Sequence, residues 1–178
     1  MNLKLMDLIR MEYDFCWDTE TWFAPLESAL DGLNSTDASW QPPGGGNTIW
    51  QTVKHLNYYN ALLVRQIYDT TTGKEASNDK PTFGDIGEPV DSKWDKILAE
   101  DTFGESGDPA DSEKWEAFML DTRRICEDLR KSLAQVKDSQ LDEELAGRLA
   151  RQILHNAYHI GQIVLIRKQQ GSWPEVRE

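Results

Sequence analysis

Residues 142–171 have the sequence DEELAGRLARQILHNAYHIGQIVLIRKQQG. Apolar side chains recur in it at steps of three and four, which is the spacing of one face of an α-helix. Gly171 and, shortly after it, Pro174 are typical residues at the end of a helix. The segment therefore predicts a long amphipathic helix over about residues 142–170, with one face in the core. That face consists of Leu145, Leu149, Ile153, Asn156, Ile160, Ile163 and Val164.

Residues 2–31 have the same periodicity, and Gly32 follows as a stop signal. Pro25 lacks a backbone N–H, so it kinks or divides a helix that contains it. The sequence predicts one long amphipathic helix with a kink or a division near Trp22. Its apolar face consists of Leu5, Met6, Ile9, Tyr13, Cys16, Trp17, Phe23, Leu26 and Leu30.

Two further segments predict long helices. The first covers residues 48–71, with the Asn-Thr pair at 47–48 as candidate caps, and follows an irregular loop that contains PPGGG. The second covers residues 112–136 and opens with the Asp-Ser pair at 111–112. Their apolar faces consist of Ile49, Val53, Leu56, Asn60, Leu63 and Ile67, and of Trp115, Phe118, Met119, Ile125, Cys126, Leu129, Leu133 and Val136.

Four long amphipathic helices, with no segment that alternates as a strand does, are typical of a helical bundle. The connection between the second and third helices is about forty residues long, whereas the other two are short. A connection of that length lets two consecutive helices lie parallel. The sequence, of which 39% is hydrophobic, therefore predicts an all-α four-helix bundle that forms a single domain over residues 1–178.

The composition excludes several classes of partner. The chain has 31 acidic and 19 basic residues and a net charge of -12, which repels nucleic acids and anionic lipid surfaces. No run approaches the roughly 20 apolar residues of a membrane span, and the N-terminal MNLKLMDLIRMEYDFCW reaches acidic residues too early for a signal peptide. Cys16 and Cys126 have no metal-binding spacing and are expected to be buried thiols. These features predict a soluble, cytoplasmic protein that binds neither nucleic acid nor membranes.

The long connection contains a short repeat. Residues 82–92, TFGDIGEPVDS, and residues 102–112, TFGESGDPADS, are identical at seven of eleven positions. We interpret the repeat as a tandem duplication that supplies capped helix starts and packs through Phe83 and Phe103. A calcium-binding loop is the alternative, but neither copy has the spacing or the terminal glutamate of an EF-hand.

The chain has three histidines, and all of them fall on predicted helices. His155 and His159 are four positions apart, so their imidazoles share one helix face. Each of these two, like His55, comes one position before a residue of its apolar face, which places all three at the edge of the core-facing sector. If the second and fourth helices are neighbours, the three rings can converge on one metal ion. The plainer interpretation is that the histidines pack at the boundary of the core.

Three imidazoles without a thiolate would leave a coordination position open, as in catalytic rather than structural metal sites. Such ligands suit zinc, nickel, copper or ferrous iron. HNAYH has Asn156 where the HExxH motif of zinc peptidases has its glutamate, so peptidase chemistry of that type is disfavoured. A fourth ligand from the acidic connection, for example Asp85, Asp91 or Glu105, would instead close the site.

Two segments of the chain resemble the DinB-like superfamily, which is also described as YfiT-like metal-dependent hydrolases. They are NTIWQTVKHLNYYNALL, which follows the WQPPGG loop, and LHNAYHIGQIVLIRKQQGSW near the C-terminus. The resemblance implies an up-down-down-up four-helix bundle whose metal triad is His55, His155 and His159. It also implies a homodimer and a thiol-dependent activity, as in the similar mycothiol-dependent maleylpyruvate isomerase and bacillithiol S-transferases.

The residues and the resemblance together predict a metal-dependent enzyme that acts on a small-molecule substrate. A divalent ion, with zinc or nickel favoured and iron or copper still open, would activate water for hydrolysis or a low-molecular-weight thiol for S-transfer. Arg151, Gln162 and Tyr59 are near enough in the helical pattern to orient a substrate, although packing at the helix edge explains them equally. The alternative function is that of a non-catalytic, metal-binding or stress-related helical bundle.

Overall fold

A computed structural model describes residues 3–72 and 102–175 of the chain. Within these ranges all regular secondary structure is helical, which confirms the predicted all-α fold. No helix that the structure describes is long and apolar enough to cross a membrane. The elements are α1 (Leu5–Trp17), α2 (Leu26–Leu30), α3 (Ser35–Ser39), α4 (Ile49–Thr72), α6 (Ser112–Gln135), the 3-10 helix η1 (Asp138–Gln140) and α7 (Glu143–Gln170).

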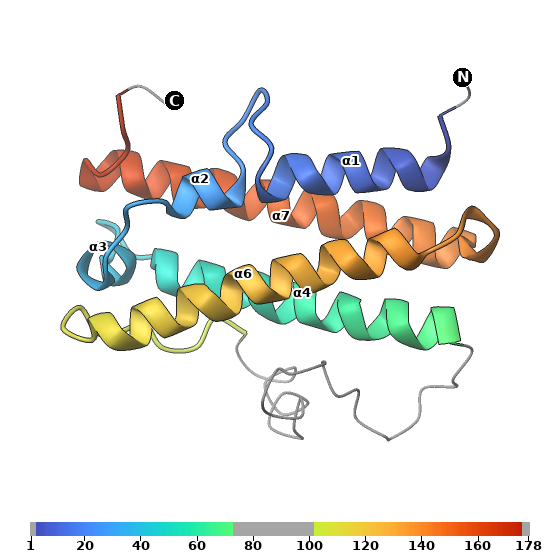
Figure 1. Ribbon diagram of the computed structural model, residues 1–178. Helices are drawn as coiled ribbons and strands as arrows, with labels where there is room; N and C mark the ends of the chain where they lie inside the picture. The colour runs from blue at the N-terminus through green and yellow to red at the C-terminus, as the bar shows by residue number, and fades with distance from the viewer. Residues whose placement is uncertain (1–2, 73–101, 176–178) are drawn as a thin grey trace.

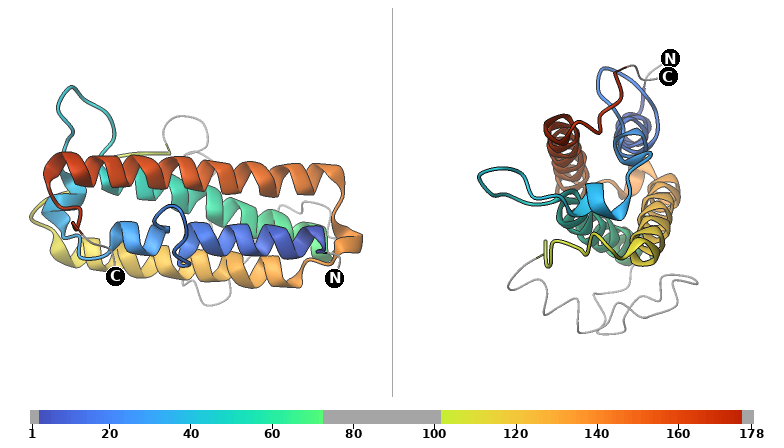
Figure 2. Two further views of the ribbon diagram at one scale, coloured as in Figure 1. Left: turned by 90° about the horizontal axis from the view of Figure 1, so that it is seen from above. Right: turned by 90° about the vertical axis from the view of Figure 1, so that its left-hand side faces the viewer.

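The long helices α1, α4, α6 and α7 lie side by side (Figure 1). α1 and α7 run in one direction, and α4 and α6 run in the opposite direction (Figure 2). α1 and α4 each pack against both α6 and α7, so the order around the bundle is α1, α6, α4, α7. The long connection between α4 and α6 joins two parallel helices, as its length leads us to expect. The contact between α4 and α7 makes neighbours of the two helices that carry the histidines.

One continuous apolar core joins the long helices. Every residue of the predicted α4 face is buried, and so is the predicted α7 face apart from Ile153 and Val164, which pack against the core from its edge. Burial of an apolar side chain of this size contributes about 1.5–3 kcal/mol to folding. The predicted faces of α4 and α7 are therefore ones that hold the bundle together. The predicted face of the first helix is wrong at Leu5 and Phe23, which are exposed. That residues 1–178 form a single domain stays a prediction, because part of the chain lies outside the described ranges.

Side-chain caps fix where the long helices begin and end. At the start of α4 the Gln51 N–H donates to Thr48 Oγ1 (3.1 Å), and the Thr48 N–H donates to Gln51 Oε1 (2.9 Å). Such a reciprocal pair satisfies two N–H groups that the helix itself leaves unpaired. Asp111 caps α6, Asp142 caps α7, and Gly171 ends α7 in the left-handed region with φ of 77°. Of the two cap residues predicted for each of α4 and α6, Thr48 caps α4 and Asp111 caps α6.

The N-terminal helix is shorter than predicted. α1 ends at Trp17 and α2 begins only at Leu26, so the division predicted near Trp22 extends over residues 18–25. Residues 18–21 are DTET, which offer the core no apolar side chain and include two β-branched threonines. Pro25 then precedes the first residue of α2 as its N-cap. The Trp22 side chain is fully exposed and contributes nothing to the core.

The short helix α3 lies between α2 and the PPGGG loop, where the sequence pattern predicts no helix. It begins because the Asn34 side chain accepts a hydrogen bond from the Asp37 N–H (2.9 Å). A helix of five residues is too short to show a periodic pattern. The buried Ser35 hydroxyl donates to the carbonyl of Pro109 (2.8 Å), so α3 anchors the segment that leads into α6.

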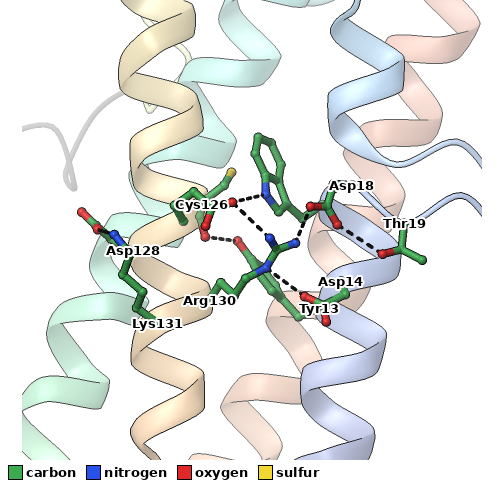
Figure 3. Close-up of polar contacts among 10 residues, drawn as sticks. Tyr13, Asp14, Asp18, Thr19, Cys126, Asp128, Arg130 and Lys131 are labelled. Atoms are coloured by element: carbon green, nitrogen blue, oxygen red, sulfur yellow. Dashed lines mark hydrogen bonds and ion pairs between the residues drawn. The ribbon is translucent and has the colours of Figure 1, made fainter.

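Arg130 joins α6 to α1 on the edge of the bundle opposite the α4–α7 edge (Figure 3). Its guanidinium forms ion pairs with Asp14 (3.0 Å) and Asp18 (2.7 Å). Beside it, the Tyr13 hydroxyl donates to the carbonyl of Cys126 (2.7 Å). These contacts secure the α1–α6 edge without using any residue of the edge that carries the histidines.

Candidate metal centre

The three histidines meet between α4 and α7. His55 Nε2 and His155 Nε2 are 3.0 Å apart. The ring centroid of His159 lies 4.7 Å from that of His55 and 4.5 Å from that of His155. One ring nitrogen from each histidine lies within 4.8 Å of the corresponding nitrogens of the other two. The structure thus brings together all three residues that the sequence analysis identified as candidate ligands.

This spacing is close to what one metal ion requires. Zinc–nitrogen bonds are about 2.0–2.1 Å long, so two nitrogens bound to one ion lie no more than about 4.2 Å apart. The His55–His155 pair satisfies that limit, and the 4.8 Å within which all three ligand atoms lie exceeds it by less than about 1 Å. Among the residues that the structure describes, these three histidines form the one group of potential ligands with such spacing.

Hydrogen bonds at the outer ring nitrogens favour the tautomer that a metal ligand needs. His159 Nδ1 lies 2.7 Å from Gln162 Oε1, and the amide nitrogen of Gln162 donates to the Tyr158 hydroxyl (3.1 Å). Because an amide oxygen only accepts, His159 carries its proton on Nδ1 and presents a lone pair at Nε2. His55 Nδ1 lies 2.5 Å from Thr102 Oγ1, which leaves its Nε2 facing His155.

The protonation states suit metal binding. Burial and, to a smaller extent, the neighbouring His159 together lower the pKa of His155 to about 4. Burial also lowers the pKa of His159, against a smaller opposing effect of its hydrogen bond to Gln162. Imidazoles must be neutral to bind a metal ion. His155 and His159 are therefore already in the ligand form at neutral pH.

Aromatic rings surround the histidines. The Tyr59 ring lies edge-on, 4.8 Å from His55 and 5.0 Å from His155, and Phe103 is stacked on His55. Tyr59 and Gln162, two of the three neighbours that the sequence analysis considered, therefore contact the centre. The third, Arg151, is exposed and has its guanidinium beside Gly147. Tyr59 and Phe103 therefore pack against the His55 ring on two sides.

No fourth protein ligand joins the histidines within the described residues. Glu105, one candidate for that position, is exposed and is not part of the ligand group. The other candidates, Asp85 and Asp91, lie outside the described residues. A centre with three protein nitrogens leaves room on an ion for water or a substrate atom, which is the arrangement of catalytic zinc sites.

Thr102 and Phe103 are two residues of the centre whose contact with a histidine the sequence does not predict. Thr102 contacts His55 Nδ1, and Phe103 stacks on the same ring with centroids 4.0 Å apart and planes within 4°. Both belong to the second copy of the repeat, for which the sequence predicts packing through Phe103 but no contact with a histidine. The TFG tripeptide, which occurs in both copies of the repeat, was the sequence feature that could have pointed to these two residues.

The cysteines do not take part in the centre. Cys16 and Cys126 are both buried and free of disulfide bonds. Burial raises the pKa of each thiol to about 12. At neutral pH they therefore stay protonated, and neither is a nucleophile.

Comparison with known proteins identifies the family. A family model described as the DinB superfamily matches residues 19–163, a range that includes His55, His155 and His159. No curated protein and no solved structure matched the chain. The matched range covers well over half of the 178 residues, and the fold is all-α, as the resemblance implied. The chain is therefore a member of the DinB superfamily.

Proposed function

We propose that His55, His155 and His159 bind one divalent metal ion and that the protein is a metal-dependent enzyme acting on a small-molecule substrate. The observation that carries this proposal is the convergence of three histidines, two of them with lowered pKa values, in a centre with no fourth ligand among the described residues. Membership of the DinB superfamily also supports it. A divalent ion bound there would lower the pKa of water or of a low-molecular-weight thiol.

The chain's own residues prepare the centre in three ways. Burial keeps His155 and His159 neutral, so that their lone pairs are available at physiological pH. Gln162 fixes the tautomer of His159 through its amide oxygen. The Tyr59 ring packs against the rings of His55 and His155 and so helps to hold them beside each other. The reaction we propose is hydrolysis or thiol S-transfer.

The donor set also bears on the choice of ion. Three imidazoles without a thiolate or a carboxylate suit zinc or nickel, and iron or copper are compatible with the same ligands. Calcium and magnesium prefer oxygen ligands, so the centre does not suit them. We therefore propose zinc or nickel as the first ions to test.

The metal content of the purified protein tests the proposal. Protein purified without added metal or chelator is expected to contain about one divalent ion per chain by elemental analysis, whereas His155→Ala and His159→Ala lose most of it. Gln169→Ala, an exposed change on the same helix, is the matched control and should retain the ion. A wild-type protein with no more metal than His155→Ala would refute metal binding.

Activity is tested on the metal-loaded protein with electrophilic substrates, with and without a low-molecular-weight thiol. Turnover that disappears in His159→Ala and persists in Gln169→Ala is the expected result. A protein that holds its ion tightly but shows no turnover across a broad panel would instead identify a non-catalytic metal-binding bundle.

A further inference from the structure

Residues 102–109, which we call the docked segment, lie along the first half of α4. Its contacts with α4 and α3 follow one another along the chain. Thr102 Oγ1 is 2.5 Å from His55 Nδ1, Gln51 Nε2 donates to the Gly104 carbonyl (2.7 Å), Thr48 Oγ1 donates to the Ser106 carbonyl (3.0 Å), and Ser35 Oγ donates to the Pro109 carbonyl (2.8 Å). The docked segment therefore joins the centre to the start of the helix that carries His55.

Close packing at Gly107 fixes how the segment lies. A Cβ at this position would be 2.4 Å from the Trp50 ring, and the backbone there has φ of +86°. Trp50 cannot move aside easily, because its ring packs against Trp115 (centroids 5.0 Å apart) and Phe118 (5.8 Å). At Gly104 the nearest atom is instead the flexible end of Lys54. Gly107 is thus the position at which docking is most sensitive to a side chain.

A comparison of the two copies of the repeat shows that the positions with identical residues include most of those that make contacts in the docked segment. Thr102, Phe103, Gly104, Gly107 and Pro109 have identical residues at the equivalent positions of the first copy. Within residues 102–109 the two copies differ only at the three remaining positions, of which Ser106 meets α4 through its backbone carbonyl. The duplicated sequence therefore keeps those side chains and glycines that make the contacts of the docked segment.

The docked segment determines the orientation of the His55 ring. Phe103 covers one face of the ring, with the planes within 4° of parallel, and Thr102 contacts Nδ1. A stacked ring on its face and a hydrogen bond at one nitrogen together restrict rotation of the imidazole and select its tautomer. Nε2, the remaining ring nitrogen, is then directed at His155 Nε2, 3.0 Å away.

We infer that Thr102 is a positioning residue for the metal centre: its hydroxyl accepts the Nδ1–H of His55 and so holds Nε2 as a ligand. The inference rests on the proposed metal site and adds to it a residue outside the ligand set. Outer hydrogen-bond partners of histidine ligands typically contribute 10–100-fold to metal affinity.

The test compares Thr102→Val, which keeps the shape of the side chain and removes the hydroxyl, with Thr102→Ser, which keeps the hydroxyl. Zinc affinity is measured by competition with a chromogenic chelator. Thr102→Val is expected to bind zinc about 10–100-fold more weakly than wild type, and Thr102→Ser within about threefold of it. Thr70→Val is the matched control, because Thr70 is exposed on α4 and its hydroxyl bonds only within that helix.

Two further measurements separate positioning from a general loss of structure. Nitrogen NMR of the zinc-loaded protein should show His55 as the Nδ1–H tautomer, with the Nδ1 resonance displaced in Thr102→Val but not in Thr70→Val. Gly107→Ala, which moves the docked segment without changing a ligand or Thr102, should also weaken zinc binding, while circular dichroism shows unchanged helix content.

The outcomes distinguish this inference from the proposed function. A wild-type protein that binds zinc, together with a Thr102→Val variant of equal affinity and unchanged Nδ1 resonance, would overturn the role of Thr102 and leave the metal site intact. A wild-type protein that binds zinc no better than His155→Ala would overturn both.

Discussion

Burial holds the pKa of His155 near 4, below its ordinary value of 6.5, and His159 lies beside it. The side chain is therefore a neutral base throughout the physiological range. A protonated histidine must release its proton before it can bind a metal ion, whereas the lone pair of the neutral His155 is available directly. The same environment makes protonation costly, because a charged His155 would be partly desolvated and would lie beside a second imidazole.

This environment predicts an acid-sensitive fold in the metal-free protein. Because the folded pKa of His155 is lower than the unfolded one, the unfolded chain binds more protons between about pH 6.5 and 4, and stability falls as the pH is lowered through that window. The free energy of unfolding of chelator-treated protein, measured by urea denaturation, should fall more between pH 7 and pH 4.5 for wild type than for His155→Gln. Equal losses would contradict the burial of this histidine.

Single residues differ in how far the sequence alone could identify them. The convergence of the three histidines was predictable because helical geometry relates His155 to His159, and because His55 has the same offset from the core face of its helix. Thr102 and Phe103 were not, since their contact with His55 depends on the path of a connection that no periodicity describes. A hydrogen bond between residues 47 positions apart leaves no local pattern.

The helices were predictable where an apolar face and a cap coincide. α4, α6 and α7 begin and end within about two residues of the predicted bounds, because Thr48, Asp111 and Gly171 act at their ends. The end of α1 was not predicted, since the apolar pattern resumes beyond residues 18–25 and conceals the break. α3 depends on the Asn34 cap and on a contact with Pro109, and the second of these is tertiary.

The buried face of α6 provides a test of the bundle. Leu129 has no exposed surface and lies in the core, so Leu129→Ala should lower the free energy of unfolding by about 2–5 kcal/mol. Leu120→Ala is the matched control on the same helix, since 65% of that side chain is exposed, and should change stability by less than about 0.5 kcal/mol. Equal effects in urea denaturation would show that the face has been assigned incorrectly.

For the whole molecule, the direction of each helix follows from the lengths of the connections. A long connection joins the parallel helices α4 and α6, whereas η1 and its flanking residues turn the chain sharply between the antiparallel α6 and α7. This order of helices makes α4 and α7 neighbours, and the site depends on that contact. The sequence could suggest the contact but not establish it, because four similar amphipathic helices can be arranged around a core in several orders.

That two chains assemble into a homodimer stays a prediction. Sedimentation equilibrium should give twice the chain mass of 20.4 kDa. The exposed Trp22 and Phe23, beside a cavity of about 430 Å³ lined by α7 residues, offer a surface to examine in such an assembly. A mass of one chain at every concentration measured would rule the dimer out.

The contact between the docked segment and His55 has a reciprocal consequence. Binding of an ion and docking of the segment would both involve His55, so the two equilibria would be thermodynamically linked. If docking raises the affinity for the ion by some factor, a bound ion raises the equilibrium constant for docking by the same factor. Occupancy of the centre would then be communicated to the chain just before α6, where backbone amides should exchange their hydrogens more slowly in the loaded protein. A cation held by α4 and α7 would in this way also stabilise the entry to a third helix.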